Sequence, residues 1–251
     1  MAILSLESVA AAPWGEELLQ DINLELDAGQ VLAILGPNGA GKTSLLNLLC
    51  GAVTPTRGDY RFGGRPMADW PISQRACSQA VLPQHSSLNF PYTVEEVILL
   101  GRTPHASGAA GDRLILDEVL AATDTLYLRD RLYTQLSGGE KQRVQLGRAF
   151  AQVWRAADSD LRLLMLDEPT AALDLSHQVL LLDQLRSMAR QGCAVVMVVH
   201  DFNLAARYAD LCLVLQNGHQ RALGAPSEIF TPALFEDVFS VPVTISRHPT
   251  V

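Results

Sequence analysis

The hydrophobic pattern of the first thirty residues is that of half-buried strands. Apolar and polar side chains alternate in "ILSLESV" (residues 3–9) and in "DINLELDAGQ" (residues 21–30). Alternation with a period of two places one face of a strand in a core, so these segments predict antiparallel strands joined by a turn. "VLAILG" (residues 31–36) is continuously apolar and predicts a buried strand, with a helix in "KTSLLNLLCG" (residues 42–51). "RGDYRFGG" (residues 57–64) predicts another short strand bounded by glycines.

The segment from residue 88 to residue 152 changes to a helical pattern. Apolar side chains recur at helical spacing in "TVEEVILLG" (residues 93–101), "DRLILDEVLAATDTL" (residues 112–126) and "EKQRVQLGRAFAQVW" (residues 140–154). No convincing strand lies between these three stretches. The pattern therefore predicts an all-helical lobe inserted into a larger domain.

After residue 153 the chain alternates apolar strands with helices. "LRLLMLD" (residues 161–167) and "AVVMVVHD" (residues 194–201) are apolar along most of their length, and residues 176–192 between them have helical spacing. Such alternation is typical of a mainly parallel sheet covered on both faces. Residues 211–223 predict two strands around Asn217-Gly218, a strong hairpin signal.

These elements predict an α/β protein made of three segments. Residues 1–87 would carry the antiparallel β subdomain and the first part of the core. Residues 88–152 would form the helical lobe, and residues 153–251 the remainder of the core with C-terminal helices.

Composition narrows the class of protein. The 251 residues are 48% hydrophobic and carry a formal charge of -8. Because the net charge is negative, sequence-independent binding to nucleic-acid phosphates is not expected. The start "MAILSLESVA" lacks the features of a secretory signal, and the apolar run at residues 193–199 is far short of the ~20 residues of a membrane span. The cysteines lack metal-ligand spacing, and Cys50, Cys193 and Cys212 are predicted to be small core residues of a soluble, cytoplasmic protein.

"GPNGAGKT" (residues 36–43) follows a predicted strand and opens a predicted helix, the setting in which a glycine-rich loop binds phosphate. The glycines allow backbone N–H groups to turn inward on the β- and γ-phosphates, Lys42 adds charge there, and the Thr43 hydroxyl can ligate Mg²⁺. A chance glycine-rich turn is the weaker alternative in this setting. The expected nucleotide contacts are Gly36, Pro37, Asn38, Gly39, Ala40, Gly41, Lys42, Thr43 and Ser44.

Polar residues at strand ends supply the remaining candidate chemistry. Asp167 and Glu168 follow a buried strand, where Asp167 can hold Mg²⁺ through water and Glu168 can orient or deprotonate the attacking water. His200 closes a neighbouring strand; a lone histidine is more often structural, but this placement favours contact with the γ-phosphate and with Glu168. Gln84, where the core meets the lobe, can touch Mg²⁺ or water, although singly it would be an ordinary loop residue.

"LSGGEKQR" (residues 136–143) predicts a second anion site. Ser137 and Glu140 have the spacing of a capping box, so a helix should begin here, and Gly138 and Gly139 leave its first N–H groups approachable. The alternative is a well-capped helix with no ligand.

In their order along the chain these motifs resemble the nucleotide-binding subunits of ATP-binding cassette (ABC) transporters. The resemblance covers nearly the whole chain, from the phosphate loop through Gln84, "LSGGEKQR", "LLMLDEP" and "AALD" (residues 171–174) to His200. It implies a P-loop NTPase (RecA-like) core, ATP and Mg²⁺ as cofactors, and hydrolysis of ATP.

The resemblance also implies a head-to-tail homodimer. Ser137, Gly138 and Gly139 would then bind the γ-phosphate of the neighbour's nucleotide, Asp174 would couple the two sites, and Trp14 would stack on adenine. Trp14 stands where a tyrosine is commoner, which leaves stacking possible. Ala171 replaces a side chain that often hydrogen-bonds across the interface, a loss of only ~1 kcal/mol.

Two classes of function remain open. A soluble ABC ATPase acting on DNA or ribosomes usually carries coiled-coil arms or two cassettes, and this chain has neither, so a transport subunit at the cytoplasmic face of the inner membrane is favoured. Residues 80–105 resemble importers for ferric siderophores, vitamin B12 and haem, most closely haem (hemin) import ATPases. The implied partners are a permease dimer and, indirectly, a periplasmic binding protein. Direct haem ligation by His85 or His105 is not expected.

Overall fold

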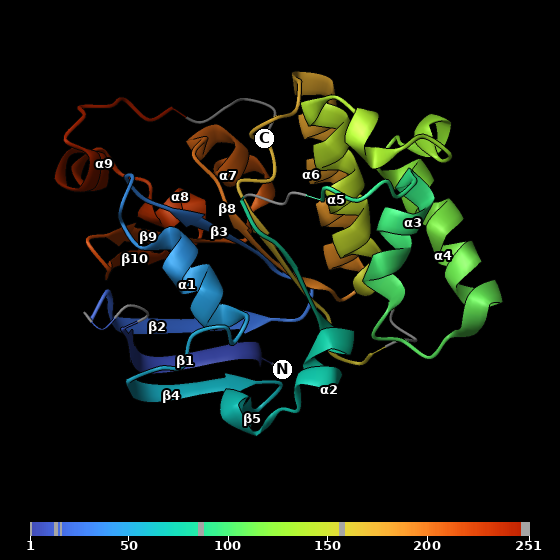
Figure 1. Cartoon of the computed structure of the whole chain (residues 1–251). Helices are drawn as coiled ribbons and strands as arrows, with labels where there is room; N and C mark the ends of the chain where they lie inside the picture. Colours follow the sequence, from blue (N-terminus) through green and yellow to red (C-terminus); the bar gives the residue numbers. More distant parts are fainter. Residues whose placement is uncertain (1, 13–14, 16, 85–87, 156–158, 247–251) are drawn as a thin grey trace. The chain divides into compact units, whose positions relative to one another are not determined.

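The computed structural model describes residues 2–12, 15, 17–84, 88–155 and 159–246, coloured along the chain in Figure 1. The described chain forms two compact units. The first contains Met1–Asp69 with Val196–Val251, and the second contains Trp70–Val195. The segment boundaries expected from the sequence, at residues 87 and 152, stay a prediction.

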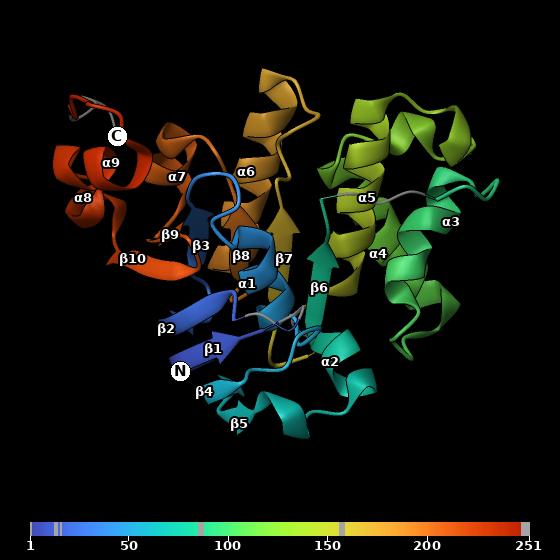
Figure 2. The ribbon, with the colours of Figure 1, turned by 60° about the vertical axis from the view of Figure 1, so that its left-hand side comes forward.

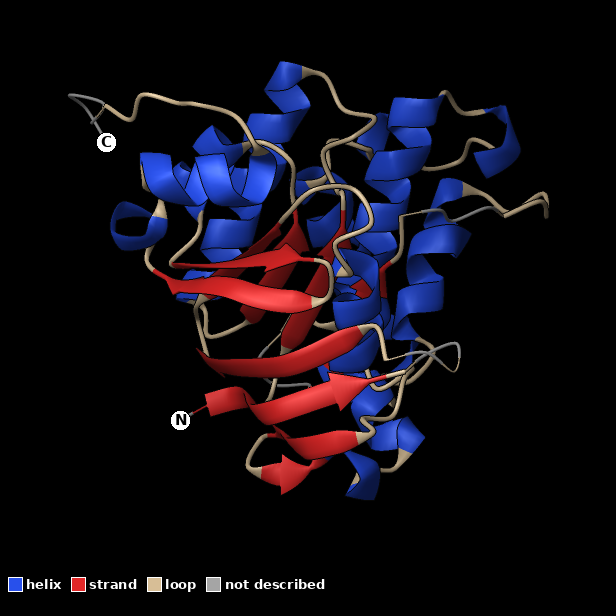
Figure 3. Ribbon diagram, turned by 90° about the vertical axis from the view of Figure 1, so that its left-hand side faces the viewer, coloured by secondary structure: helices blue, strands red, loops and turns tan. Residues whose placement is uncertain are grey.

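The first unit is built on a sheet in the order β5-β4-β1-β2-β10-β9-β3. Figure 3 shows its antiparallel strands in red. The strands are β1 (Ala2–Ala11), β2 (Leu19–Asp27), β3 (Val31–Leu35), β4 (Arg57–Phe62), β5 (Arg65–Pro66), β9 (Leu211–Gln216) and β10 (His219–Gly224). The N-terminal strands are antiparallel, as their alternation predicts: β1 pairs with β2 and with β4.

The phosphate-loop strand lies in a parallel part of this sheet. β3 pairs in parallel with β9, with Leu32 opposite Leu211 and Leu35 opposite Val214, and all five β3 residues are buried. The predicted hairpin joins β9 to β10, and its turn residues Asn217 (φ 50°) and Gly218 (φ 78°) both have the positive φ of a type I′ turn.

Helices complete the first unit. α1 (Lys42–Leu49) follows the phosphate loop and buries its leucines, while α7 (Phe202–Tyr208), α8 (Pro226–Ile229) and α9 (Pro232–Phe239) gather in the C-terminal part of the unit, orange to red in Figure 2. β8 (Ala194–Val198) passes from the second unit into the first at Val196.

The second unit is mostly helical. Its elements are α2 (Ile72–Ser78), β6 (Gln79–Leu82), α3 (Val94–Leu99), α4 (Gly108–Ala122), α5 (Gly138–Gln152), β7 (Leu163–Asp167) and α6 (Leu175–Arg190). Helices α3, α4 and α5 lie side by side and contact one another through apolar faces (Figure 1). Within residues 88–152, all of which are described, the one extended pairing is the single bridge between Thr93 and Leu132. The predicted α/β fold with N-terminal antiparallel strands and a helical insertion is confirmed.

Two local features differ from expectation. Residues 79–82 form β6, which pairs in parallel with β7, although the sequence analysis assigned no strand there. Cys50 is half-buried at the C-terminus of α1, where its Sγ donates to the Asn47 carbonyl, so it is not a core residue like the buried Cys193 and Cys212.

Candidate functional site

The phosphate loop of the first unit is fixed by close backbone packing. Gly36 follows β3 with φ 150°, and a Cβ on it would lie 2.3 Å from the Leu215 carbonyl oxygen, so a side chain does not fit without displacing β9. The other end of the loop is tied to the hairpin, because the Gly218 N–H donates to the Ala40 carbonyl at 3.0 Å. The loop conformation is thus set by strands on either side of it.

The ammonium of Lys42 is held inside this loop. The side chain is 7% exposed, and Nζ donates to the carbonyls of Gly36 and Pro37 at 2.9 Å each. Helix α1 begins at Lys42, after Gly41 with φ 100°, so backbone N–H groups and the ammonium converge on one concave turn. Thr43 is exposed on the first turn of α1. This combination of donors and charge is suited to an anionic phosphate chain.

His200 shares a cavity with the phosphate loop. A hollow of about 250 Å³ is lined by Leu35, Gly36, Pro37, Asn38, Val199, His200, Phe202 and Phe239. The Val199 N–H donates to the Ile34 carbonyl at 3.2 Å, which places the residues after β8 beside the end of β3. The expected neighbourhood of His200 and the loop therefore exists within the first unit.

Asp167 and Glu168 emerge from the end of β7 in the second unit. Asp167 is 2% exposed, whereas Glu168 is half-buried and has φ 50°, a left-handed backbone conformation that is uncommon for a residue with a side chain. Such a conformation persists only where the surrounding structure imposes it, and it is enriched at functional sites.

Gln84 lies at the same edge as this acidic pair. Leu82 of β6 is opposite Leu166 of β7 in the parallel register, and Gln84 and Glu168 each follow two residues later. Gln84 is exposed. The second unit therefore brings Gln84, Asp167 and Glu168 to neighbouring strand ends; the strand before Gln84 was not expected from the sequence.

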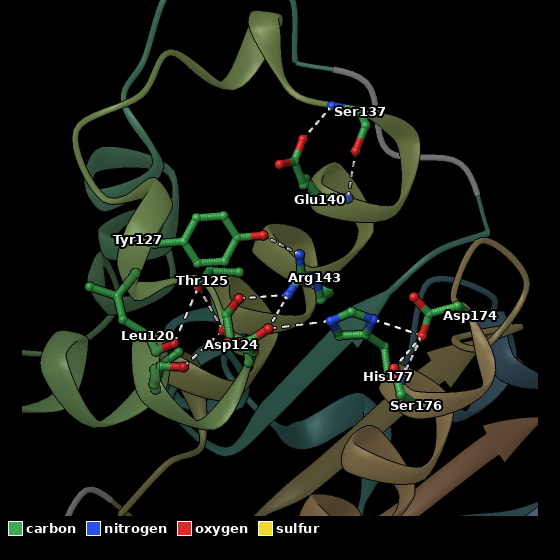
Figure 4. Close-up of polar contacts among 12 residues, drawn as sticks. Leu120, Asp124, Thr125, Tyr127, Ser137, Glu140, Arg143, Asp174, Ser176 and His177 are labelled. Atoms are coloured by element: carbon green, nitrogen blue, oxygen red, sulfur yellow. Dashed lines mark hydrogen bonds and ion pairs between the residues drawn. The ribbon is translucent and has the colours of Figure 1, made fainter.

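The predicted capping box opens α5, as Figure 4 shows. The Ser137 N–H donates to Glu140 Oε2 at 2.7 Å, and Ser137 Oγ accepts from the Glu140 N–H at 3.4 Å. These bonds with Ser137, the backbone bond foremost, lower the pKa of Glu140. Ser137 and Gly138 are exposed, so the start of the helix is open to a ligand.

Asp174 caps the next helix of the unit, α6. Its Oδ1 accepts from the His177 N–H at 2.9 Å, and the bonds from His177 and Ser176 lower the pKa of this carboxyl. The loop before it, residues 168–174, touches α5: Gln142 Nε2 donates to the Pro169 carbonyl at 3.3 Å. Ala171 is exposed, so a hydrogen-bonding side chain at this position would face outward. The alanine has no such side chain.

Some expected residues lie outside the described part of the chain. Trp14 and His85 are among them. His105 is described, and its Nε2 lies 2.8 Å from the Gln152 carbonyl. Sequence analysis gave no role to Asp124 and His177, which link α5 to Asp174, or to Arg143 at the end of "LSGGEKQR". No local motif joins Asp124 to His177, because they are 53 positions apart.

Two further findings bear on the class of protein. Among the described residues, none of the helices combines the length and the apolar character needed to cross a membrane. No cluster of three or more histidine, cysteine, aspartate or glutamate side chains suited to a metal occurs in the part of the chain that the structure describes. Taken separately, the Thr43 hydroxyl of the first unit and the Asp167 carboxylate of the second are oxygen donors of the kind that Mg²⁺ prefers.

Comparisons with known proteins agree with this geometry. The ABC transporter family model matches residues 19–171. The hemin import ATP-binding protein HmuV of Gloeobacter violaceus is 50% identical over 94% of this chain and 86% of its own length. HmuV of Pseudomonas entomophila is 48% identical over 98% of this chain and 96% of its own length.

Solved structures give the same result. An ATP-binding subunit of an ABC transporter has a TM-score of 0.80 at 25% identity, covering 90% of this chain and 91% of that one. An inward-facing ABC transporter assigned to the metal-chelate type has a TM-score of 0.80 at 30% identity, covering 96% and 90%. The chain therefore belongs to the ABC transporter family, in which it is an ATP-binding subunit and an ATPase.

Proposed function

We propose that this chain hydrolyses ATP to power the import of haem through a membrane permease. The observation that carries the cargo assignment is the near full-length similarity, at 50% and 48% identity, to two proteins named hemin import ATP-binding protein. As an ABC transporter subunit the chain works with a permease, and the name of these relatives favours an importer at the cytoplasmic face of the inner membrane.

The first unit would hold the phosphates of ATP. Lys42 and the N–H groups of Gly39 and Gly41 would bind the β- and γ-phosphates in place of the loop carbonyls that Lys42 now contacts. Pro37, Asn38, Ala40 and Ser44 would complete the loop, and Trp14 would stack on adenine.

Residues of both units would supply the groups for hydrolysis. The Thr43 hydroxyl, the Asp167 carboxylate and the Gln84 amide are hard oxygen donors, and they would hold Mg²⁺, which neutralises developing charge at the phosphates when bound. Glu168 would take a proton from the attacking water, and His200 would contact the γ-phosphate. The half-buried position of Glu168 and the open position of Gln84 support these roles.

The phosphate site would be completed by a second copy of the chain. The exposed start of α5 offers Ser137, Gly138 and Gly139 to the γ-phosphate of a neighbour, and Asp174 would lie at the same interface. A homodimer held together in this way closes when ATP is bound and relaxes after hydrolysis, which couples the chemical step to the permease. A periplasmic binding protein would deliver the cargo to the permease, and we expect no nucleic-acid partner and no direct haem binding by this subunit.

Reconstitution with the permease tests the cargo. The transporter in liposomes is supplied with binding protein loaded with haem, ferric siderophore or vitamin B12 in turn. We expect ATPase stimulation and cargo uptake with haem alone, and neither activity in a Glu168→Gln transporter.

Each other outcome has its own meaning. Stimulation by ferric siderophore or vitamin B12 would transfer the same role to that importer. Recovery of the chain on DNA or ribosomes, with no permease, would favour the soluble ATPase class.

A further inference from the structure

A polar bridge joins the helix of the signature motif to the loop that carries Asp174. We define the Asp124 bridge as Arg143 of α5, Asp124 after α4, and His177 with Asp174 at the start of α6, all within the second unit (Figure 4). We propose that Asp124 and His177 are positioning residues for ATP hydrolysis, because this bridge fixes Ser137 and Asp174 as one rigid block.

On the α5 side the bridge is anchored by a buried guanidinium. Arg143 lies on the helix that Ser137 caps, and its side chain is 8% exposed. Its Nη1 donates to the Asp124 carbonyl at 2.6 Å and to Asp124 Oδ2 at 2.8 Å, and Nη2 donates to the Tyr127 hydroxyl at 2.8 Å. Charge-assisted bonds of a buried arginine favour one geometry, so Arg143 ties Asp124, whose side chain is 57% exposed, to α5.

On the α6 side the same carboxylate oxygen meets a histidine. His177 Nε2 lies 3.3 Å from Asp124 Oδ2, and His177 Nδ1 lies 2.8 Å from Asp174 Oδ1. The imidazole therefore spans the gap between two carboxylates, one on each side. Asp174 is tied to His177 a second time through the backbone N–H at 2.9 Å.

Tight packing beside the bridge supports a rigid connection. A Cβ on Gly139 would lie 3.1 Å from the Ala172 carbonyl oxygen, so the loop approaches the first turn of α5 closely. The hollow lined by Arg143, Leu173 and His177 measures about 10 Å³, which is at most the room of one water molecule. Little space remains for α5 and the loop to slide against each other.

The Asp124 bridge would make Ser137 and Asp174 move together. Ser137 and Asp174 are both placed by the proposed function at the neighbour's nucleotide, and the inference rests on that placement. If the two move together, one displacement of α5 aligns both groups with the neighbouring site. Breaking the bridge would let each reach the interface separately, which lowers the fraction of dimers in the hydrolysing arrangement.

His177→Ala removes the link while leaving the helix start intact. Asp174 would still cap α6 through the His177 backbone N–H and the Ser176 hydroxyl. In the reconstituted transporter we expect kcat to fall roughly threefold to thirtyfold, with the Kd of the chain for ATP and its thermal midpoint unchanged. His177→Gln, whose amide can still donate to Asp124, should recover part of the loss. Asp183→Ala, at an exposed carboxylate on the same helix, is the matched control and should behave as wild type.

A double-mutant cycle separates a bridge from two independent effects. The double variant Asp124→Ala with His177→Ala should lose no more activity than the more impaired of the two single variants, because either change breaks the same connection. Additive losses, or wild-type kcat in His177→Ala, would overturn the proposal. Glu168→Gln is measured alongside: if it alone is inactive, the catalytic base of the proposed function stands without the bridge, and if it too hydrolyses ATP normally, the role proposed for Glu168 fails independently of the bridge.

Discussion

At the scale of a single residue, the backbone conformation of Glu168 marks it as part of the candidate site. It has φ 50° directly after the buried Asp167, so its side chain leaves the strand in a direction that an extended backbone would not give it. A carboxylate held in this way is a candidate general base, because a base must lie within hydrogen-bond reach of the water that it deprotonates.

Glu168→Gln preserves the size and backbone of this residue and removes the base. We expect ATP hydrolysis to slow by about 10²-fold or more, the usual contribution of a general base, while ATP binding persists. Turnover and equilibrium ATP binding, measured on the same preparation, check this. Hydrolysis at the wild-type rate would mean that another group accepts the proton.

Lys42→Ala should have the opposite profile. The Lys42 ammonium is buried in the loop and supplies its positive charge, so its removal should abolish measurable ATP affinity and turnover together. Isothermal titration with ATP checks this, and Asn47→Ala, half-buried on the same helix and away from the loop, is a suitable control. Tight ATP binding by Lys42→Ala would refute the assignment of the phosphate loop.

The four cysteines should divide into two reactive and two protected thiols. Burial raises the pKa of Cys193 to about 12 and that of Cys212 to about 12, whereas Cys50 and Cys77 are half-buried. Because the thiolate is the reactive form, a disulfide reagent at pH 8 should modify Cys50 and Cys77 in the native protein and all four cysteines after denaturation. Rapid modification of Cys193 in the native state would contradict its position in the core.

At the scale of an element, helix α5 combines a capping box with a possible ligand site. Glu140 has a folded-state pKa below its ordinary value, so its carboxylate stabilises the helix above the unfolded pKa of about 4.3. That contribution is lost as the pH falls through the lower, folded value.

Glu140→Gln therefore should cost stability near neutral pH and little in acid. Glutamine can still accept from the Ser137 N–H, but it lacks the charge that the helix N-terminus favours, a term of about 0.3–1 kcal/mol. We expect the thermal midpoint at pH 7 to fall by about 1–4 °C, and the difference to shrink towards pH 3. A difference that grows in acid would have the wrong sign.

Elements were predictable where their signals are local. The strand, glycine loop and α1 follow one another within residues 31–49, and the capping box of α5 spans four residues, so pattern alone located them. Strand β6 was missed because it has only four residues, which are too few to show a recognisable apolar pattern. Its pairing with β7 comes from tertiary packing. The contact of Asp124 with His177 was out of reach for the same reason, since distant residues meet there without any sequence periodicity.

At the scale of the whole molecule, the exposed start of α5 and the phosphate loop raise the question of which chain each serves. In a head-to-tail dimer, the loop of one protomer and Ser137 of the other would share one ATP. A change in the loop and a change at Ser137 then act on the same site only when they lie on different protomers. This dependence on arrangement distinguishes the dimer from a monomer that uses both features itself.

Mixed dimers make this dependence measurable. In a Glu168→Gln background, Lys42→Ala on one protomer is combined with Ser137→Arg either on the other protomer or on the same one, and trapped ATP is counted after gel filtration. With the changes on different protomers, both fall on one site and the other site should retain its ATP. With both on the same protomer, each site carries one defect and neither should retain ATP. Retention of ATP only when both changes lie on the same protomer would exclude sharing, because a protomer that used its own α5 would keep one intact site only when both changes lie on its neighbour.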